Sequence, residues 1–420
     1  MMKTYKLVCS VCGTLSSKTE APFVCENCGG QLEPVIQVSK LDFKKIVENG
    51  CNRGVWDYKE LLPLDGIEEP VTLGEGATPL IKADNIAKML GMKAIYAKNE
   101  TLNPSGTYKD RFSTVALSIE KAKNTTAVAL GSAGNAAASI SAYSAKANIP
   151  CFVMLPPGAV AERAWQVRGY GAHLIKMENT IHDCIQHAKM GENLFGWKSL
   201  TTNMLTNPLA SDGYKTVSYE IGKQLAWKVP DWVIVPVGGA ALISKIYKGF
   251  KDLKENGVTD KMPHIVAAQS EHCAPLVKAF HQQASVPEIW DGIPKTIAFA
   301  IADVCSYDGA AALDAIYKTN GYAETVSEEE ILNAMNMLAS KEGIVAEPAS
   351  SCTVACLIKM LEKGIIQKED SVCCIITGNG MRDLKLFNEG KKEVPYIKYK
   401  DDDSFISTVS SILNGVENKS

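Results

Sequence analysis

The sequence predicts an α/β protein with mostly parallel sheets, and three features of the chain support this. Short β-branched, apolar runs alternate with helical stretches from about residue 75 onward. Several of these runs are apolar throughout, as expected for parallel strands that are buried on both faces. Four of the runs end in loops of unusual composition, and open α/β sheets place their sites at such strand ends. Strand–helix alternation of this kind is typical of parallel α/β folds.

The individual elements follow from periodicity and from their flanking residues. Strands are predicted at 94–100, 126–132, 150–156, 173–177, 232–239, 264–270 and 372–380. Helices are predicted at 138–148, 212–227, 241–255 and 328–342, with a short closing helix at 405–413.

Composition limits the classes of function. The chain has 420 residues, 46% hydrophobic and 22% charged, which indicates a globular protein of two or three domains. The net charge is −3 and no basic block occurs, so nucleic acid is not an expected partner. No apolar run approaches the length of a membrane span, and the first residues show no signal peptide. Single cysteines in apolar segments fit a reducing compartment, so we expect a cytoplasmic protein.

Residues 1–35 are predicted to form a unit of their own. Two CxxCG turns, separated by twelve residues, each offer two thiolates, and a glycine after the second cysteine permits a close backbone approach. Four such thiolates suit a closed tetrahedral zinc site with a structural role. Iron, or a degenerate or redox-active cysteine pair, are the alternatives. The predicted zinc ligands are Cys9, Cys12, Cys25 and Cys28.

One lysine stands in a constrained turn, the stretch NPSGTYKDR at 103–111. A lysine that forms a Schiff base needs such a setting because it must be held in one place. Two further loops, GSAGN at 131–135 and VGGAALI at 237–243, expose backbone amides at helix starts and suit a carboxylate and a phosphate. A fourth places a threonine at a strand end, in TGNG at 377–380.

Each loop alone has an ordinary explanation. A glycine-rich turn before a helix is usually just a tight connection, and the lysine stretch could be a solvated helix start. Neither GxGxxG nor a Walker A lysine motif is present, so the sequence gives no support for nucleotide binding. Taken together, the four loops match a cofactor that carries an aldehyde, a phosphate and a ring nitrogen. Pyridoxal phosphate (PLP) is that cofactor.

The chain resembles the threonine synthases, which belong to the fold type II family of PLP enzymes. The resemblance covers essentially residues 1–390. The matching segments, in order, are GVWDYKELLP (54–63), LGEGATPL (73–80), NPSGTYKDR (103–111), SAGN (132–135), NPLASDGYKT (207–216), EPASS (347–351) and TGNGMRD (377–383).

This resemblance implies a tryptophan synthase beta-like fold with two parallel-sheet α/β domains and an N-terminal zinc ribbon. The expected division is a ribbon at 1–35, a larger cofactor-binding domain at 36–129 and 211–420, and a smaller mobile domain at 130–210. The family usually forms homodimers, and its substrates are small amino acids.

The resemblance also implies roles for individual residues. Lys109 carries the Schiff base and then moves protons between substrate carbons. Asn135 lies beside the cofactor ring, and Thr377 faces the pyridine nitrogen. The backbone of Gly238, Gly239, Ala240, Ala241 and Leu242 holds the cofactor phosphate. The residues expected on the substrate side are Ser132, Ala133, Gly134, Ser105, Thr107 and Lys215.

Four positions depart from the family pattern. Gly239 and Leu242 stand where asparagines are usual, and Ala136 replaces a threonine. Ala210 stands where the family has an arginine for the substrate phosphate. The absence of this arginine should weaken binding of a phosphorylated substrate unless another cation, such as Lys215 or Arg111, compensates.

The leading interpretation is therefore a threonine synthase, which makes threonine and phosphate from O-phosphohomoserine and water. The first alternative is another PLP reaction on a related amino acid. Examples are replacement on O-phosphoserine, as in cysteate synthase, and threonine or serine ammonia-lyase activity. The second alternative is a catalytically silent relative with a regulatory or scaffolding role.

Overall fold

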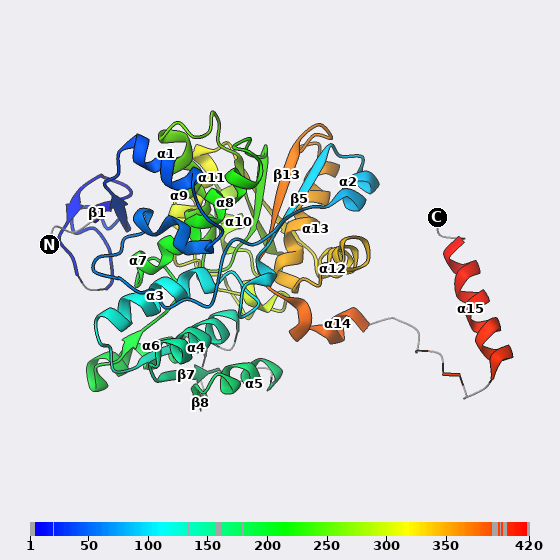
Figure 1. Ribbon diagram of the computed structural model, residues 1–420, viewed down its shortest axis with the longest axis horizontal. Helices are drawn as coiled ribbons and strands as arrows, with labels where there is room; N and C mark the ends of the chain where they lie inside the picture. Colours follow the sequence, from blue (N-terminus) through cyan, green and yellow to red (C-terminus); the bar gives the residue numbers. More distant parts are fainter. Residues whose placement is uncertain are drawn as a thin grey trace. The chain divides into compact units, whose positions relative to one another are not determined.

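The computed structural model describes residues 5–19, 21–132, 134–156, 161–178, 180–388, 394, 396, 397 and 401–417. The chain divides into two units, Met1–Asp383 and Leu384–Ser420. The second unit contains α14 (Leu384–Asn388) and α15 (Asp402–Glu417), drawn in orange and red in Figure 1. The predicted closing helix is thus confirmed and is longer at both ends. Asp402 and Asp403 favour its start because carboxylates stabilise the positive end of a helix.

The larger sheet of the first unit has six strands in the order β12-β11-β10-β13-β5-β4. All neighbours are parallel except the edge pair β4–β5. The central strands are almost entirely buried, which is the burial that their continuous apolar sequences predicted. The strands are β4 (Leu80–Lys82), β5 (Ala94–Asn99), β10 (Trp232–Pro236), β11 (His264–Ser270), β12 (Tyr322–Val326) and β13 (Ser371–Ile376).

A second sheet has four parallel strands in the order β8-β7-β6-β9. Helices α4 (Asn135–Ala147) and α6 (Ile181–Phe195) pack against it. The predicted α/β class with two parallel sheets is confirmed, whereas the domain limits at 130 and 210 stay a prediction. The strands are β6 (Val128–Gly131), β7 (Cys151–Leu155), β8 (His173–Lys176) and β9 (Lys198–Ser199).

Helices cover both sheets (Figure 1). Two of them begin as their sequences indicate: α12 has a capping box of Ser327 and Glu330, and α13 has Pro348 in its first turn. The helices of the first unit are α1 (Lys40–Glu48), α2 (Asp84–Leu90), α3 (Asp110–Ala122), α4 (Asn135–Ala147), α5 (Ala161–Gly169), α6 (Ile181–Phe195), α7 (Pro208–Ser211), α8 (Thr216–Gln224), α9 (Ala241–Glu255), α10 (Pro275–His281), α11 (Gly309–Lys318), α12 (Glu328–Glu342) and α13 (Pro348–Glu362). Short 3₁₀ helices lie at Gly54–Leu61, Glu100–Leu102, Asp212–Lys215, Phe299–Ile301 and Gly380–Arg382.

The N-terminal segment is a small antiparallel ribbon of β1 (Tyr5–Cys9), β2 (Leu15–Ser16) and β3 (Leu32–Ile36). Its core is small and consists of Cys9, Cys25 and Leu32, with Phe23 packed against them. The two CxxCG turns bring the four predicted thiols together, and all four sulfur atoms lie within 4.8 Å of one another. So small a core needs a further source of stability, and a metal would supply it.

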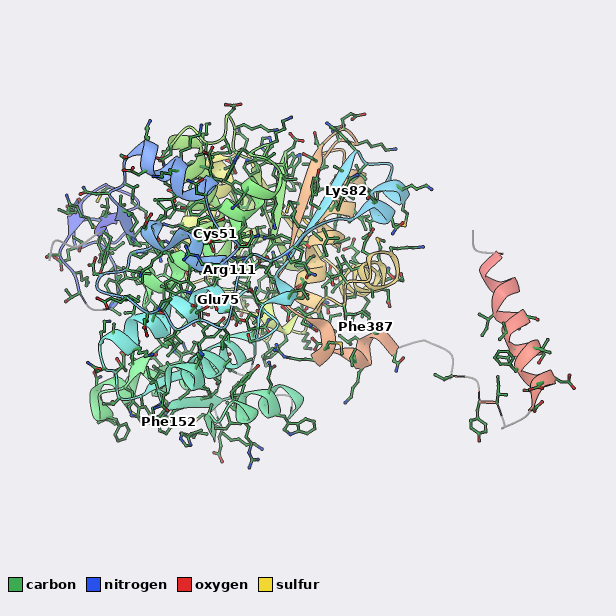
Figure 2. All side chains as sticks on the ribbon, in the orientation of Figure 1. Cys51, Glu75, Lys82, Arg111, Phe152 and Phe387 are labelled. Atoms are coloured by element: carbon green, nitrogen blue, oxygen red, sulfur yellow. The ribbon has the colours of Figure 1, made fainter. Side chains whose placement is uncertain are left out.

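A buried ionic network joins β5, α3 and α8 through Lys98, Arg111 and Glu220 (Figure 2 labels Arg111). The Arg111 guanidinium contacts Glu100 Oε1 at 2.7 Å and Glu220 Oε1 at 2.6 Å. Lys98 Nζ contacts Glu220 Oε2 at 2.7 Å. Burial alone would raise the pKa of Glu220, but the charges of Arg111 and Lys98 outweigh burial and hold it at about 2.

Within the described residues no helix combines the length and the apolar character that crossing a membrane requires.

Candidate active site

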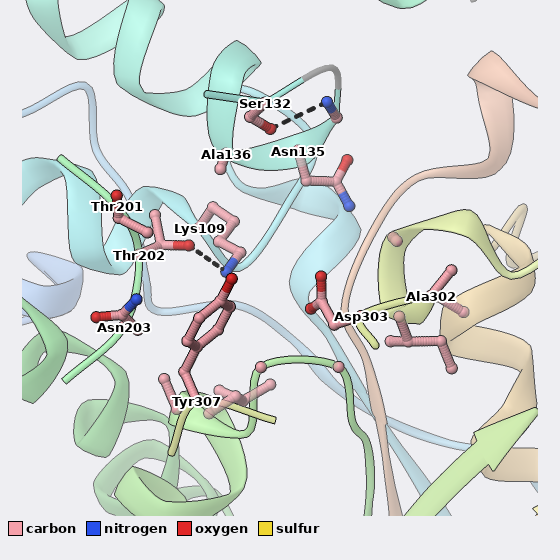
Figure 3. Close-up of a pocket in the computed structure, with 18 of the residues that line it drawn as sticks. Lys109, Ser132, Asn135, Ala136, Thr201, Thr202, Asn203, Ala302, Asp303 and Tyr307 are labelled. Atoms are coloured by element: carbon pink, nitrogen blue, oxygen red, sulfur yellow. Dashed lines mark hydrogen bonds between the residues drawn. The ribbon is translucent and has the colours of Figure 1, made fainter. Parts of the chain in front are cut away.

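The four predicted loops meet at one cavity of about 300 Å³. They follow the carboxyl ends of β5, β6, β10 and β13, so strand ends from both sheets converge on it. Figure 3 shows Lys109, Asn135, Asp303 and Tyr307 around the same space. The predicted residues that line the cavity are Lys109, Ser132, Gly134, Asn135, Gly238, Gly239, Ala240, Ala241, Leu242 and Thr377.

Lys109 is positioned by the turn that precedes α3. The Tyr108 N–H donates to the Thr377 carbonyl at 2.9 Å, which ties this turn to the end of β13. The Lys109 ammonium then donates to Thr202 Oγ1 at 2.8 Å and lies 4.9 Å from the centre of the Tyr108 ring. The lysine is therefore held at one place in the cavity, as its constrained turn predicted.

A carboxylate joins two of the predicted residues. Asn135 Nδ2 donates to both oxygens of Glu347, at 3.0 and 2.9 Å, and Thr377 Oγ1 donates to Glu347 Oε1 at 3.4 Å. Asn135 Oδ1 accepts a 2.5 Å hydrogen bond from Arg382 Nη1. Arg382 is also anchored by the Ser105 carbonyl at 2.8 Å. The side chains of Asn135 and Thr377 are thus fixed at one wall, and Arg382 stands behind Asn135.

The start of α9 forms the opposite wall. The first amides of a helix have no partner within it, and they point toward whatever lies ahead of the helix. Ala240 adopts φ +75°, a left-handed conformation that turns the chain into α9. The Gly238 and Gly239 carbonyls accept from Ser306 Oγ at 3.0 Å and from the Asp308 N–H at 2.9 Å. These two bonds fix the loop, and the Gly239 N–H bonds the Asp303 carboxylate, so the amides that point into the cavity are those at the start of α9 itself.

Two residues of the cavity, Asp303 and Tyr307, were missed by sequence reasoning. They come from the irregular segment after the 3₁₀ helix Phe299–Ile301. A Cβ added at Gly238 would lie 2.4 Å from Asp303 Oδ2, so this carboxylate packs directly on the loop. Burial raises the pKa of Asp303, although the charge of Lys109 and a hydrogen bond from the Gly239 N–H both act to lower it. Thr201, Thr202 and Asn203 were also missed, because β9 before them has only two residues and gives no detectable pattern.

Other predicted residues do not line the cavity. Ser105 and Thr107 are buried beside it, and Ser105 donates its Oγ–H and N–H to Asp110. Lys215 is buried and contacts Asp212 Oδ2 at 2.9 Å. The suggestion that Lys215 or Arg111 compensates for Ala210 is therefore wrong, because both cations are already neutralised by buried carboxylates. Ala133 lies outside the described residues.

Two parallel sheets whose strand ends meet around a lysine, with a helix start opposite, are the arrangement of the PLP-dependent lyases of fold type II. Comparison with known proteins agrees. The family model "Pyridoxal-phosphate dependent enzyme" matches residues 71–378. The chain is 40% identical to the threonine synthase of Methanocaldococcus jannaschii, over 89% of this chain and 92% of that protein. It is 38% identical to the threonine synthase of Methanosarcina acetivorans, over 90% and 92%. The chain belongs to the PLP-dependent enzymes and, within them, to the threonine synthase family.

Solved structures support the fold. Threonine deaminase isoform 2 from Solanum lycopersicum superposes with a TM-score of 0.65 at 19% identity, covering 89% of this chain and 97% of that chain. Serine racemase from Dictyostelium discoideum gives 0.59 at 24% identity, covering 72% and 92%.

Proposed function

We propose that this protein is a threonine synthase that converts O-phosphohomoserine and water into threonine and phosphate. The observation that carries the proposal is the cavity that Lys109 shares with the start of α9 and with Ser132, Gly134 and Asn135. In this reaction the Cγ–O bond to phosphate breaks and a Cβ–O bond to water forms. We further propose that the protein is a homodimer, as the family resemblance implies. We also propose a cytoplasmic location, because the thirteen cysteines form no disulfide, as is typical of a reducing compartment.

The residues of the cavity fit PLP. Amides at the start of α9 match its phosphate, and Lys109 matches its aldehyde. Thr377, at the far wall, offers a hydroxyl for the ring nitrogen. When bound, PLP supplies an electron sink that makes the α-carbon of the substrate acidic.

The chain's own residues would divide the remaining work. Lys109 would take a proton from the substrate and return it at another carbon, with Thr202 holding its amine in place. The turn at Ser132 and Gly134, whose N–H donates to Ser132 Oγ at 3.2 Å, would bind the substrate carboxylate. Asn135, fixed between Glu347 and Arg382, would orient the cofactor ring.

A second candidate is elimination on unphosphorylated threonine or serine. Among the described residues that line the cavity, Lys109 is the one cation, whereas Asp303 and Glu347 are carboxylates. Ala136 is small and contributes no hydroxyl, and Ala210 is buried in α7 away from this lining. This charge balance is less suited to a phosphorylated substrate than an arginine-bearing site would be.

The deciding experiment offers the PLP-loaded protein O-phosphohomoserine, O-phosphoserine, threonine or serine, and identifies the products by mass. Threonine and phosphate from the first substrate would support the threonine synthase. Ammonia and a keto acid from threonine or serine, with no turnover of O-phosphohomoserine, would contradict the threonine synthase proposal and support the second candidate.

Asp303 allows a test of the proposed phosphate position. In the variant Asp303→Asn, apoprotein should bind PLP about five- to tenfold more tightly, because the substitution removes a negative charge beside the phosphate loop. The measurement is a titration of apoprotein with PLP, followed by absorbance. Asp291→Asn changes the charge equally at an exposed position and should leave the affinity unaltered. Weaker binding by Asp303→Asn would instead show that the carboxylate is needed to hold the Gly239 amide.

We also propose that the four cysteines bind one structural zinc ion. A tetrahedral Zn–S₄ site places its sulfur atoms about 3.8 Å apart. The Sγ atoms of Cys9 and Cys28 are 3.5 Å apart, and those of Cys12 and Cys25 are 3.7 Å apart. The thiols therefore fit the ion, and a closed site of four ligands leaves no position for catalysis.

Metal analysis tests this second proposal. We expect about one zinc per chain, and much less in Cys12→Ser, with a lower unfolding temperature of the ribbon. Cys51→Ser removes an exposed thiol outside the cluster and should keep the metal. Full stability without zinc would contradict the proposal, and bound iron would support the alternative metal.

A further inference from the structure

The ribbon contacts the rest of the protein beside the active site. Gln31, which precedes β3, donates from Nε2 to Asp308 Oδ1 at 2.7 Å. The Phe23 N–H donates to the Leu205 carbonyl at 2.8 Å. Both contacts fall on segments next to residues that line the cavity, Asn203 and Tyr307.

Asp308 connects two of the loops that line the cavity. Its carboxylate accepts from the Met204 N–H, at 3.1 and 3.0 Å, as well as from Gln31. Its own N–H donates to the Gly239 carbonyl at 2.9 Å. The side chain is 1% exposed, so these bonds are not replaced by water. Asp308 therefore fixes the loop at 201–204 relative to the loop that starts α9.

The loop at 201–204 in turn holds the lysine. Thr202, two residues before Met204, accepts the hydrogen bond from Lys109 Nζ at 2.8 Å. Displacing Asp308 would release the Met204 amide and the Gly239 carbonyl together. The first change moves the partner of Lys109, and the second moves the amides at the start of α9.

We propose that Gln31 is a positioning residue of the active site, through which the ribbon sets the affinity for PLP. The ribbon has separate docking contacts: Lys248 Nζ donates to the Pro34 carbonyl at 2.7 Å, and Glu33 lies 3.7 Å from Lys245 Nζ. Attachment of the ribbon does not depend on Gln31, so the effect of this side chain is specific to Asp308. The role does not depend on which amino acid is turned over.

The test compares Gln31→Ala and Gln31→Glu with Gln37→Ala. Gln37 is an exposed glutamine of the same segment and provides the matched control. The measurements are the dissociation constant of PLP from apoprotein, the visible absorbance of PLP bound at Lys109, zinc content and unfolding temperature. We expect PLP to bind about fivefold more weakly in Gln31→Ala, which loses one hydrogen bond to a carboxylate. The loss should be larger in Gln31→Glu, which keeps the shape but places a second carboxylate against Asp308.

Zinc content should stay at the wild-type value in all three variants, and Gln37→Ala should match the wild type throughout. If Gln31→Ala lowers only the unfolding temperature and binds PLP with wild-type affinity and absorbance, Gln31 is merely structural and the proposal fails. It also fails if Gln31→Glu binds PLP as tightly as the wild type. Failure of the threonine synthase assay alone would leave these binding results unaffected.

Discussion

Replacing Lys109 with alanine is expected to lower kcat by about ten-thousand-fold, the upper range for loss of a proton-transferring side chain. The reason is positional as well as chemical. The amine is held by Thr202 Oγ1 at 2.8 Å and faces the cavity between Asn135 and the start of α9. The fold should be unaffected, because the lysine side chain forms none of the core of α3.

Two measurements check this result. The rate of product formation should fall by about ten-thousand-fold. The visible absorbance of lysine-bound PLP should disappear, while the far-ultraviolet circular dichroism stays unchanged. Lys121→Ala removes an exposed lysine from α3, the helix that follows Lys109, and should retain wild-type kcat. Substantial turnover by Lys109→Ala would show that another group performs the proton transfer.

The largest effect on stability is expected at Arg111. Arg111→Met should lower the free energy of unfolding by about 3–5 kcal/mol, because it leaves Glu100 and Glu220 buried with an uncompensated charge. The matched exposed pair is Lys82 with Asp84, whose charged atoms are 2.8 Å apart. Lys82→Met should cost less than about 1 kcal/mol, since solvent screens such pairs. Figure 2 labels Arg111 and Lys82, which belong to these two pairs.

Denaturant unfolding at several pH values tests the cause. In the wild type, Arg111 and Lys98 keep the pKa of Glu220 at about 2, so Glu220 contributes stability above the pKa of an unfolded glutamate. That contribution is lost as pH falls toward 2. In Arg111→Met the carboxylates lack their main cation, so their pKa values should rise and protonation should relieve the repulsion. The deficit relative to wild type should therefore be smaller at pH 5 than at pH 7. A deficit that does not change with pH would mean that lost packing, not charge, destabilises the variant.

Local patterns predicted the parts of the site that are themselves local. The turn at 103–111, the helix starts at Asn135 and Ala241, and Thr377 each follow a recognisable strand, and all four reach the cavity. The same holds for the CxxCG turns, whose short spacing forces their thiols together. Assigning Lys215 to the substrate was less successful, because its partner Asp212 could not be recognised without the packing of η3 (Asp212–Lys215) against α9.

The sequence by itself therefore determined the α/β class, the four loops after predicted strands that reach the cavity, and the lysine at the centre of the site. Tertiary structure alone decided that Thr202 holds Lys109, that Asp303 lies against Gly238, and that Gln31 reaches Asp308 across 277 positions of sequence. The physical reason is the separation along the chain of the groups that interact. Backbone turns and burial patterns are set by neighbours along the chain, whereas a buried hydrogen bond between distant side chains exists only after both sheets and the ribbon have packed.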